Sequence, residues 1–262
     1  MTTVKDILRV VECFAPAYMK ESWDNVGLLC GDPTQEVRKV LVALDPFEHV
    51  CREAKEIGAD LILTHHPLIF QAPKSITTQT SVGRSILCLC RHGISAINAH
   101  TNLDCTPGGV NDVLARALEL ESISVLQPSG VDEDGNSWGL LRMGVYESDL
   151  PTFLSHVKEK LHAPTLRYVD GGKVVSKVAV GGGSCADGLL DAFEAGCDTF
   201  VTADVKYNQF WDAQELGMNL IDAGHFYTEN PVVPILAGKI AEKLPEIEVI
   251  ISKTHADCMK FY

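Results

Sequence analysis

The chain contains an internal repeat of short apolar segments that end in polar residues. The segment Gly58–Thr64 is matched by Gly196–Thr202, and Gly93–His100 is matched by Gly217–His225. In each copy, a glycine that can end a helix precedes an apolar run, and polar side chains follow that run. Such units also recur by chance in unrelated α/β proteins, but here both the order and the polar ends match. The repeat therefore predicts two related α/β halves that face one another across a metal-binding cleft.

Helical and strand patterns alternate along the chain, which favours mostly parallel strands. The expected helices cover residues 4–14, 47–57, 85–91, 109–120, 150–161 and 231–243. The expected strands cover residues 40–44, 60–64, 94–98, 139–146, 174–180, 198–202, 220–222 and 247–251. A polar segment at 127–136 is the best candidate boundary. It divides the chain into a first half at residues 1–126 and a second at 127–262.

Charge and composition narrow the class of protein. The 262 residues include 35 Asp and Glu against 22 Lys and Arg, for a net charge of −13, and no basic run occurs. This balance argues against nucleic-acid binding and against binding to anionic membranes. The start lacks the features of a signal peptide, and no apolar run approaches the ~20 residues of a membrane span. The nine cysteines are scattered without a Cys-x-x-Cys pair, so we expect a soluble, cytoplasmic protein with reduced thiols.

Imidazole and carboxylate side chains follow three of the expected strands. His65 and His66 follow one strand, Asp104 lies beyond the next, and His225 and Glu229 come after a third. Open α/β sheets form their binding sites at the carboxyl ends of strands. A histidine pair is more often a solvated or core polar group, and Asp104 could simply cap the next helix. The combined set nevertheless predicts a metal site for two ions, of a kind that suits Zn, Mn, Fe, Co or Ni.

The local sequence also predicts that these side chains lie in loops. Pro67 ends the strand before it, so a loop there can turn His65 and His66 toward one cleft. Asp104 is expected in a similar loop. Asn230 and Pro231 resemble the cap and first residue of a later helix. His225 and Glu229 are therefore expected in the loop that precedes that helix, where Glu229 could bridge two ions.

Three further features allow more than one interpretation. The segment Gly181–Ser184 could hold a phosphate with its amides, or could serve close packing of a strand on a helix. Trp23, Asp24 and Asn25 form either a structural turn beside the cleft or a substrate contact. His100 could support a metal ligand, contact the substrate, or be an ordinary loop histidine.

Several motifs together resemble a known family. They are WDNVGL at 23–28, THHPLIF at 64–70, HTNLD at 100–104, GGVND at 108–112, and DAGH at 222–225 followed by Glu229. In this order, over essentially the whole chain, they are similar to the motifs of the Nif-three-like family, also called type 2 GTP cyclohydrolase I. The resemblance implies a dinuclear metal site on His65, His66, Asp104, His225 and Glu229. It also implies a homohexameric ring built as a trimer of dimers, in the short form that lacks an inserted domain.

One part of the second repeat departs from the family pattern. The family commonly has Thr-Gly-Asp followed by a Tyr-His pair, whereas this chain has Thr202-Ala203-Asp204 and then Tyr207 and Asn208. The five proposed ligands are untouched, and Asp204 remains a candidate for supporting a ligand or contacting the substrate. Asn208, however, removes the imidazole to which an acid–base or substrate role could be given.

The sequence leaves two classes of function open. One is a metal-dependent hydrolase acting on a nucleotide or another phosphorylated small molecule, by GTP cyclohydrolase-type ring opening or by phosphoester hydrolysis. The other is a noncatalytic metal-dependent assembly or regulatory protein, because a shared fold does not establish a reaction. No residue is assigned a catalytic role at this point.

Overall fold

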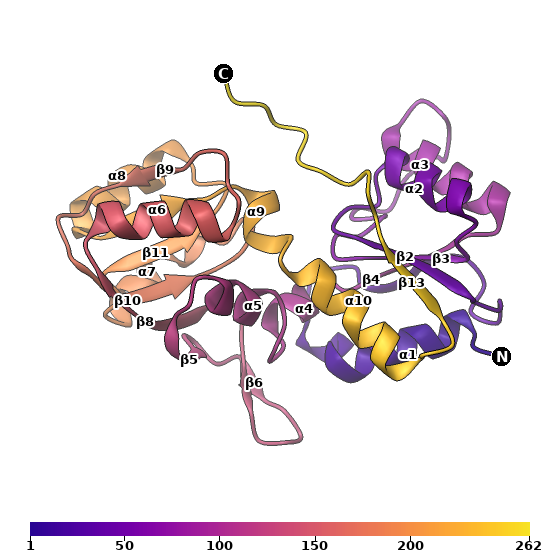
Figure 1. The fold of residues 1–262 in the computed structure, drawn as a ribbon, viewed down its shortest axis with the longest axis horizontal. Coiled ribbons are helices and arrows are strands. Elements are labelled where there is room, and N and C mark those ends of the chain that lie inside the picture. The colour runs from indigo at the N-terminus through magenta and orange to yellow at the C-terminus, as the bar shows by residue number, and fades with distance from the viewer. The chain divides into compact units, whose positions relative to one another are not determined.

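The computed structural model describes residues 1–262, which form two compact units. The first unit comprises residues 1–103 and 233–257, and the second comprises residues 104–232 and 258–262. The chain therefore passes from one unit to the other within helix α4 (Thr101–Cys105), again within helix α10 (Val232–Lys243), and a third time after residue 257. Each unit is built on one main β-sheet with helices on its faces (Figure 1).

The first unit has a five-stranded sheet with the order β1-β4-β3-β2-β13. Its strands are β1 (Gly27–Cys30), β2 (Lys39–Ala43), β3 (Leu61–Thr64), β4 (Ser95–Asn98) and β13 (Glu248–Ile251). Strands β13, β2, β3 and β4 are parallel, and β1 joins the edge of β4 in the antiparallel sense. The expected parallel arrangement is thus present in the centre of this sheet, with an antiparallel strand at one edge.

Helices cover both faces of this sheet. They are α1 (Val4–Phe14), α2 (Glu48–Ile57), α3 (Ser81–His92) and most of α10, with a short 3-10 turn η1 (Ala17–Met19) after α1. Figure 1 shows α2 and α3 on one face and α1 and α10 on the other. Strands β2, β3 and β4 are almost wholly buried because helices cover both of their sides. This double burial is why these strands are continuous apolar runs rather than alternating ones.

The second unit has a six-stranded sheet with the order β5-β8-β10-β11-β12-β9. Its strands are β5 (Glu121–Val125), β8 (Arg142–Ser148), β9 (Arg167–Val169), β10 (Val175–Val180), β11 (Thr199–Thr202) and β12 (Asn219–Asp222). Strands β10, β11 and β12 are parallel, whereas β5, β8 and β9 pair in the antiparallel sense. A separate two-stranded hairpin pairs β6 (Gly130–Val131) with β7 (Ser137–Trp138).

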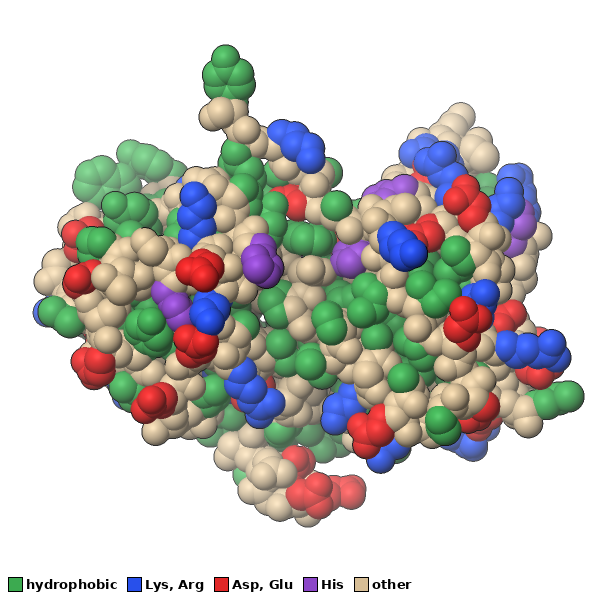
Figure 2. Space-filling model, viewed as in Figure 1, with side chains coloured by type: hydrophobic (Ala, Val, Ile, Leu, Met, Phe, Trp, Pro, Cys, Tyr) green, Lys and Arg blue, Asp and Glu red, His purple; other side chains and the backbone are tan.

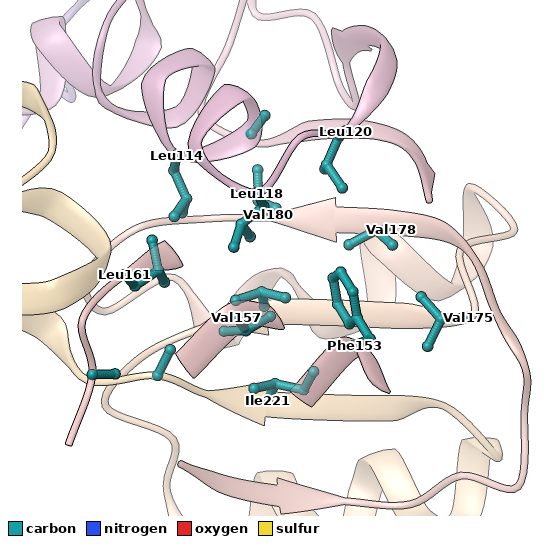
Figure 3. Close-up of a cluster of buried hydrophobic side chains, with 14 of the residues drawn as sticks. Leu114, Leu118, Leu120, Phe153, Val157, Leu161, Val175, Val178, Val180 and Ile221 are labelled. Carbon is teal, nitrogen blue, oxygen red and sulfur yellow. The ribbon is translucent and has the colours of Figure 1, made fainter. Parts of the chain in front are cut away.

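Alternate side chains of the central strands in this unit pack into two clusters of buried residues. The helices of the unit are α5 (Val110–Ala117), α6 (Leu150–Lys160), η2 (Ala186–Gly188), α7 (Leu189–Glu194), α8 (Tyr207–Leu216) and α9 (His225–Glu229). One cluster joins α5 and α6 to the sheet, and Figure 3 shows Phe153 and Val157 of α6 lying against Val178 and Ile221. The other cluster joins α7 and α8 to the opposite face. Burial of a side chain such as Phe153 contributes about 2 kcal/mol.

The parallel strands of each sheet end at the same level, which brings the segments after them together. In the first unit Ala43 is opposite Thr64, and Thr64 is opposite Asn98. In the second unit Thr202 is likewise opposite Asp222. The residues that follow these ends therefore gather at one edge of each sheet.

The compact units do not coincide with the division expected at residues 126 and 127. The polar segment at 127–136 lies between β5 and β8 of the second unit, where it forms most of the β6–β7 hairpin rather than a linker. In addition, β13 returns to pair with β2 of the first unit. Strand order is set by long-range pairing, so this return could not be seen in a linear pass along the chain.

The α/β fold class is confirmed by these mixed sheets with parallel central strands. None of the helices combines the length and the apolar character that a membrane span requires. On the face drawn in Figure 2, Lys and Arg side chains lie interspersed with Asp and Glu. This face therefore carries mixed charge rather than one continuous basic patch.

Candidate metal-binding residues

Three histidines gather at the carboxyl ends of β3 and β4 in the first unit. His65 and His66 directly follow Thr64, the last residue of β3, and His100 comes two residues after Asn98, the last residue of β4. One ring nitrogen of each histidine lies within 4.8 Å of the others. The ring centroids of His65 and His66 are 4.8 Å apart, and those of His65 and His100 are 5.2 Å apart. His100 is thus a third potential ligand beside the expected pair.

Each of these rings uses Nδ1 for a hydrogen bond to an oxygen. Nδ1 of His65 is 2.9 Å from Ala99 O, that of His66 is 2.7 Å from Asp45 Oδ1, and that of His100 is 2.8 Å from Asp24 Oδ1. A carbonyl oxygen can only accept, so Nδ1–H of His65 is the donor. Metal-binding histidines commonly give one ring N–H to such an oxygen, which directs the other nitrogen to the ion. The arrangement therefore fits a divalent metal bound through Nε2.

Asp24 is the centre of a buried hydrogen-bond network that holds His100. Its Oδ2 accepts from Thr101 N at 3.0 Å and from Thr101 Oγ1, and its Oδ1 accepts from Asn25 N at 2.7 Å. Burial by itself would raise the pKa of Asp24, but the hydrogen bonds from His100 and Thr101 outweigh it and lower that pKa well below its usual range. Asp24 is therefore an ionised residue that orients His100.

The neighbours of Asp24 have different roles. Asn25 donates from Nδ2 to Ile69 O at 2.6 Å, which ties the turn before β1 to the segment after His66. The ring of Trp23 packs edge-on against those of Phe70 and His100, with centroid distances of 5.8 Å and 6.3 Å. Trp23 is 60% exposed. Asp24 and Asn25 are thus structural contacts of the turn, and Trp23 offers an exposed aromatic face beside the histidines.

In the second unit, His225 and Glu229 lie at opposite ends of one helical turn, the short helix α9. The expectation of a loop at these residues was wrong. A helix of five residues is too short to show an apolar period, and so the sequence pattern did not reveal it. The helical spacing places His225 Nε2 2.9 Å from Glu229 Oε2. Two potential ligands are therefore side by side on α9.

Asp204 completes this arrangement from the end of β11. It has a positive φ of 52°, a conformation that Asp tolerates better than most residues. Its Oδ2 is 2.8 Å from His225 Nδ1. Burial would lower the pKa of His225, but the hydrogen bonds to Asp204 and Glu229 outweigh it and raise the pKa to about 11. Asp204 therefore orients the ring of His225 as Asp45 orients that of His66.

Asp104 lies in the helical turn α4 rather than in the expected loop. One of its carboxylate oxygens is within 4.8 Å of one from Glu229. The turn after Asp104 is held by the buried Arg142, whose guanidinium donates to Cys105 O and Thr106 O, both at 3.1 Å. In the second unit, Asp104 and His225 therefore each lie near Glu229.

The loop Gly181–Gly183 serves close packing rather than phosphate binding. The amide of Gly181 donates to Val201 O, that of Gly182 to Asn111 Oδ1, and that of Gly183 to Thr228 Oγ1. These amides are thus already used. A side chain at Gly183, where φ is +62°, would have its Cβ only 2.0 Å from Glu229 Oε1. The loop therefore packs closely against the side chain of Glu229.

Two other positions, Asn208 and Asp45, bear on the predicted site. Asn208 is exposed in the first turn of α8, and Asp45, which orients His66, was not anticipated. Asp45 comes two residues after Ala43, the last residue of β2, and this position was a signal that could have identified it, because the same rule was applied to the neighbouring strands. Imidazole and carboxylate donors of the kinds found here suit several first-row divalent ions.

Comparison with known proteins gives one consistent family. A curated relative from Clostridium perfringens, named GTP cyclohydrolase 1 type 2 homolog, is 38% identical over 98% of this chain and 99% of its own. Protein SA1388 of Staphylococcus aureus has a crystal structure with a TM-score of 0.91 and 29% identity, covering 100% of this chain and 99% of that one. A Bacillus cereus protein related to NIF3 matches with a TM-score of 0.90 and 27% identity, again over 100% and 99%.

The family model for Duf34/NIF3 (NGG1p interacting factor 3) matches residues 2–258, almost the whole chain. The motifs noted in the sequence and the two-unit α/β architecture agree with that match. The chain therefore belongs to the Duf34/NIF3 family.

Proposed function

We propose that this protein is a dinuclear metal-dependent hydrolase acting on a nucleotide-like substrate, with GTP cyclohydrolase-type ring opening as one reaction of that class. The name of the Clostridium perfringens relative supports a nucleotide-related role. The observation that carries the proposal is the common arrangement of four histidines. His65, His66, His100 and His225 each have Nδ1 hydrogen-bonded to an oxygen, which directs Nε2 toward an ion.

The proposed ligands are His65, His66, Asp104, His225 and Glu229, which would hold two divalent ions. His100 is a further ligand or a substrate contact. Three imidazoles and two carboxylates suit Zn, Mn, Fe, Co or Ni.

Bound divalent ions would supply Lewis acidity, which acidifies water near neutral pH and stabilises developing oxyanion charge. The chain itself supplies orientation. Asp45 and Asp204 fix the rings of His66 and His225, and ionised Asp24 fixes that of His100. An exposed aromatic side chain, Trp23, stands beside His100 where a substrate ring could pack. The proposed working form is a homohexamer built as a trimer of dimers, as the family resemblance implies.

A noncatalytic metal-dependent assembly or regulatory role is the second candidate. It is favoured by Asn208, which is exposed and offers no imidazole where the family motif supplies one. A metal-dependent phosphoesterase is a further form of the hydrolase proposal. The presence of turnover separates the noncatalytic role from the hydrolase, and the substrate that is turned over separates the two forms of hydrolase.

The test is metal analysis of anaerobically purified protein, followed by a screen of nucleotides and phosphoesters with the reconstituted protein. We expect about two ions per chain. His65→Ala and Asp104→Ala should each lose metal and turnover together. His49→Ala is the matched control, because His49 is an exposed histidine of α2 outside the ligand groups.

Two outcomes would contradict the proposal in different ways. Metal binding without any turnover that these substitutions abolish would favour the noncatalytic role. Failure to bind Zn, Mn, Fe, Co or Ni after reconstitution would refute both candidates.

A further inference from the structure

Two cysteines far apart in the sequence lie in contact in the first unit. Cys30 ends strand β1 and Cys90 lies near the end of helix α3. Their sulfur atoms are 3.6 Å apart, although 60 positions separate them along the chain. A disulfide has a sulfur–sulfur distance of about 2 Å, so the two sulfurs are in contact but not bonded.

An irregularity in the sheet directs Cys30 toward this helix. Leu28 is opposite Ile97 and Cys30 is opposite Ala96, so β1 has one extra residue at this point. Such a bulge re-aims the side chain that follows it. Cys30 consequently packs on the same hydrophobic cluster as Ala96 and Leu89, which lies between α3 and the sheet.

Cys90 is more accessible to solvent than Cys30. Leu89, the residue before it, is fully buried, whereas Cys90 itself is exposed and Cys30 is half-buried. An oxidant in solution can therefore reach Cys90 first. The neighbouring Cys88 points elsewhere, because its Sγ donates to Cys51 O at 3.8 Å.

We propose that Cys30 and Cys90 form a redox-active dithiol that a low-molecular-weight disulfide converts into an intramolecular disulfide. The ligand group of three found in this unit consists of the histidines, so two sulfurs alone are a poorer match to a metal site than to a disulfide. The proposal is independent of the proposed hydrolase function, because it concerns side chains other than the metal ligands.

The reaction takes place in two exchange steps. The Cys90 thiolate attacks one sulfur of the oxidant, forms a mixed disulfide and expels one thiolate. The Cys30 thiol then loses its proton to solvent and attacks the Cys90 sulfur, which expels the second thiolate. Two protein thiols are oxidised to one disulfide, and one molecule of oxidant is reduced to two thiols.

Acidity supports this order of attack. Burial and the neighbouring Cys90 raise the pKa of Cys30 to about 12, so Cys30 is a poor initial nucleophile. A mixed disulfide on Cys90 carries no thiolate charge at that sulfur, which removes one cause of the raised pKa. Cys30 is therefore better suited to attack the mixed disulfide than to react first with the oxidant.

The test is treatment of the full chain with oxidised glutathione, followed by peptide mapping with and without reductant. We expect the linked peptides of Cys30 and Cys90 as the main intramolecular product, with both thiols lost together. Cys30→Ser should instead retain glutathione on Cys90. Cys90→Ser should leave Cys30 unmodified, because the accessible nucleophile is missing.

Cys88→Ser is the matched control, since Cys88 lies two positions from Cys90 on the same helix and should leave the disulfide unchanged. Two results would overturn the proposal. One is wild-type protein that keeps glutathione on Cys90 to the same extent as Cys30→Ser. The other is protein modified at the exposed Cys13 and Cys258 but at neither Cys30 nor Cys90.

Discussion

The two units hold their central strands with the same set of contacts but place different side chains at the strand ends. Asp60 accepts hydrogen bonds from two backbone N–H groups at the start of β2, and Asp198 accepts from two at the start of β10. Lys39 donates to a carbonyl at the end of α2, and Lys177 donates to one directly after α7. The sequence repeat is therefore also a structural repeat, down to individual side-chain contacts.

The donors that follow these equivalent strands are not alike. The first unit presents three imidazoles, whereas the second presents one imidazole, at His225, among carboxylates. Positions 45 and 66 of the first unit correspond to positions 183 and 204 of the second. In the first unit these two positions hold Asp45 and His66, whose side chains are hydrogen-bonded to one another. In the second unit they hold Gly183 and Asp204.

One scaffold therefore carries two different donor sets. The contacts that position the strands involve their starts, while the donors follow their ends, so the donors can change without disturbing the framework. In the second unit the glycine at position 183 leaves the space that the Glu229 carboxylate uses. Nitrogen-rich and oxygen-rich donor sets can thus be built on related units.

The largest expected effect comes from filling that space. Gly183→Ala would introduce a Cβ 2.0 Å from Glu229 Oε1, at a φ of +62° that disfavours alanine. The strained backbone conformation of alanine and the steric overlap with Glu229 should together lower the free energy of unfolding by about 3 kcal/mol. Displacement of Glu229 should also weaken metal binding. Urea unfolding and metal titration measure the two effects.

Gly172→Ala is the control for that substitution, because its φ is +74° and no atom lies within 4 Å of the added Cβ. It should cost only the backbone term of about 1 kcal/mol and leave metal binding unchanged. If both substitutions changed stability and metal binding equally, the loop would be able to move away from Glu229. Gly183 would then not be required to make room for the carboxylate.

The next prediction tests whether the shared framework has the same strength in both units. Asp60→Ala and Asp198→Ala each remove a carboxylate that accepts two backbone N–H groups. We expect each to lower the free energy of unfolding by about 2 kcal/mol, since charged acceptors form the stronger hydrogen bonds. Hydrogen exchange of β2 and β10 measures the local effect. A loss in one unit with none in the other would break the structural equivalence.

Much of this framework could be predicted from the sequence because it is local. The apolar runs at β3 and β11 and the glycines that end the preceding helices fixed the repeat and located His65 and His66. The edge strands β1, β5 and β9 were not predicted, and none of their residues is fully buried. Strands β5 and β9 lack the continuous apolar signal of a central strand.

The site was predicted less completely than the strands that support it. Glu229 was recognised, but neither its helix nor its contact with Gly183 was, because both depend on segments distant in sequence. Asp24 was assigned only to a turn or a substrate contact, although it orients His100 from 76 positions away. Hydrogen bonds across such separations leave no periodic trace in a single sequence.

The smallest expected effect concerns a feature of the first unit alone, the return of the chain as β13. Glu53 of α2 accepts hydrogen bonds from Lys253 N, Thr254 N and Ser252 Oγ, just beyond that strand. Burial would raise the pKa of Glu53, but these bonds outweigh it and lower the pKa from the ordinary value of 4.5. Its contribution is therefore present above about pH 4.5 and is lost as the pH falls through the lowered pKa of the folded state.

Glu53→Gln should reduce the stability by about 1 kcal/mol near neutral pH, because one charged acceptor is lost. The difference from wild type should shrink as the pH falls, since wild-type Glu53 then becomes protonated as well. Hydrogen exchange at the amides of Lys253 and Thr254 reports this directly, because both donate to Glu53. Glu56→Gln, an exposed position on the same helix, should leave this exchange unchanged. Protection at these two amides that is independent of both the substitution and the pH would show that pairing of β13 with β2 alone secures the returning strand.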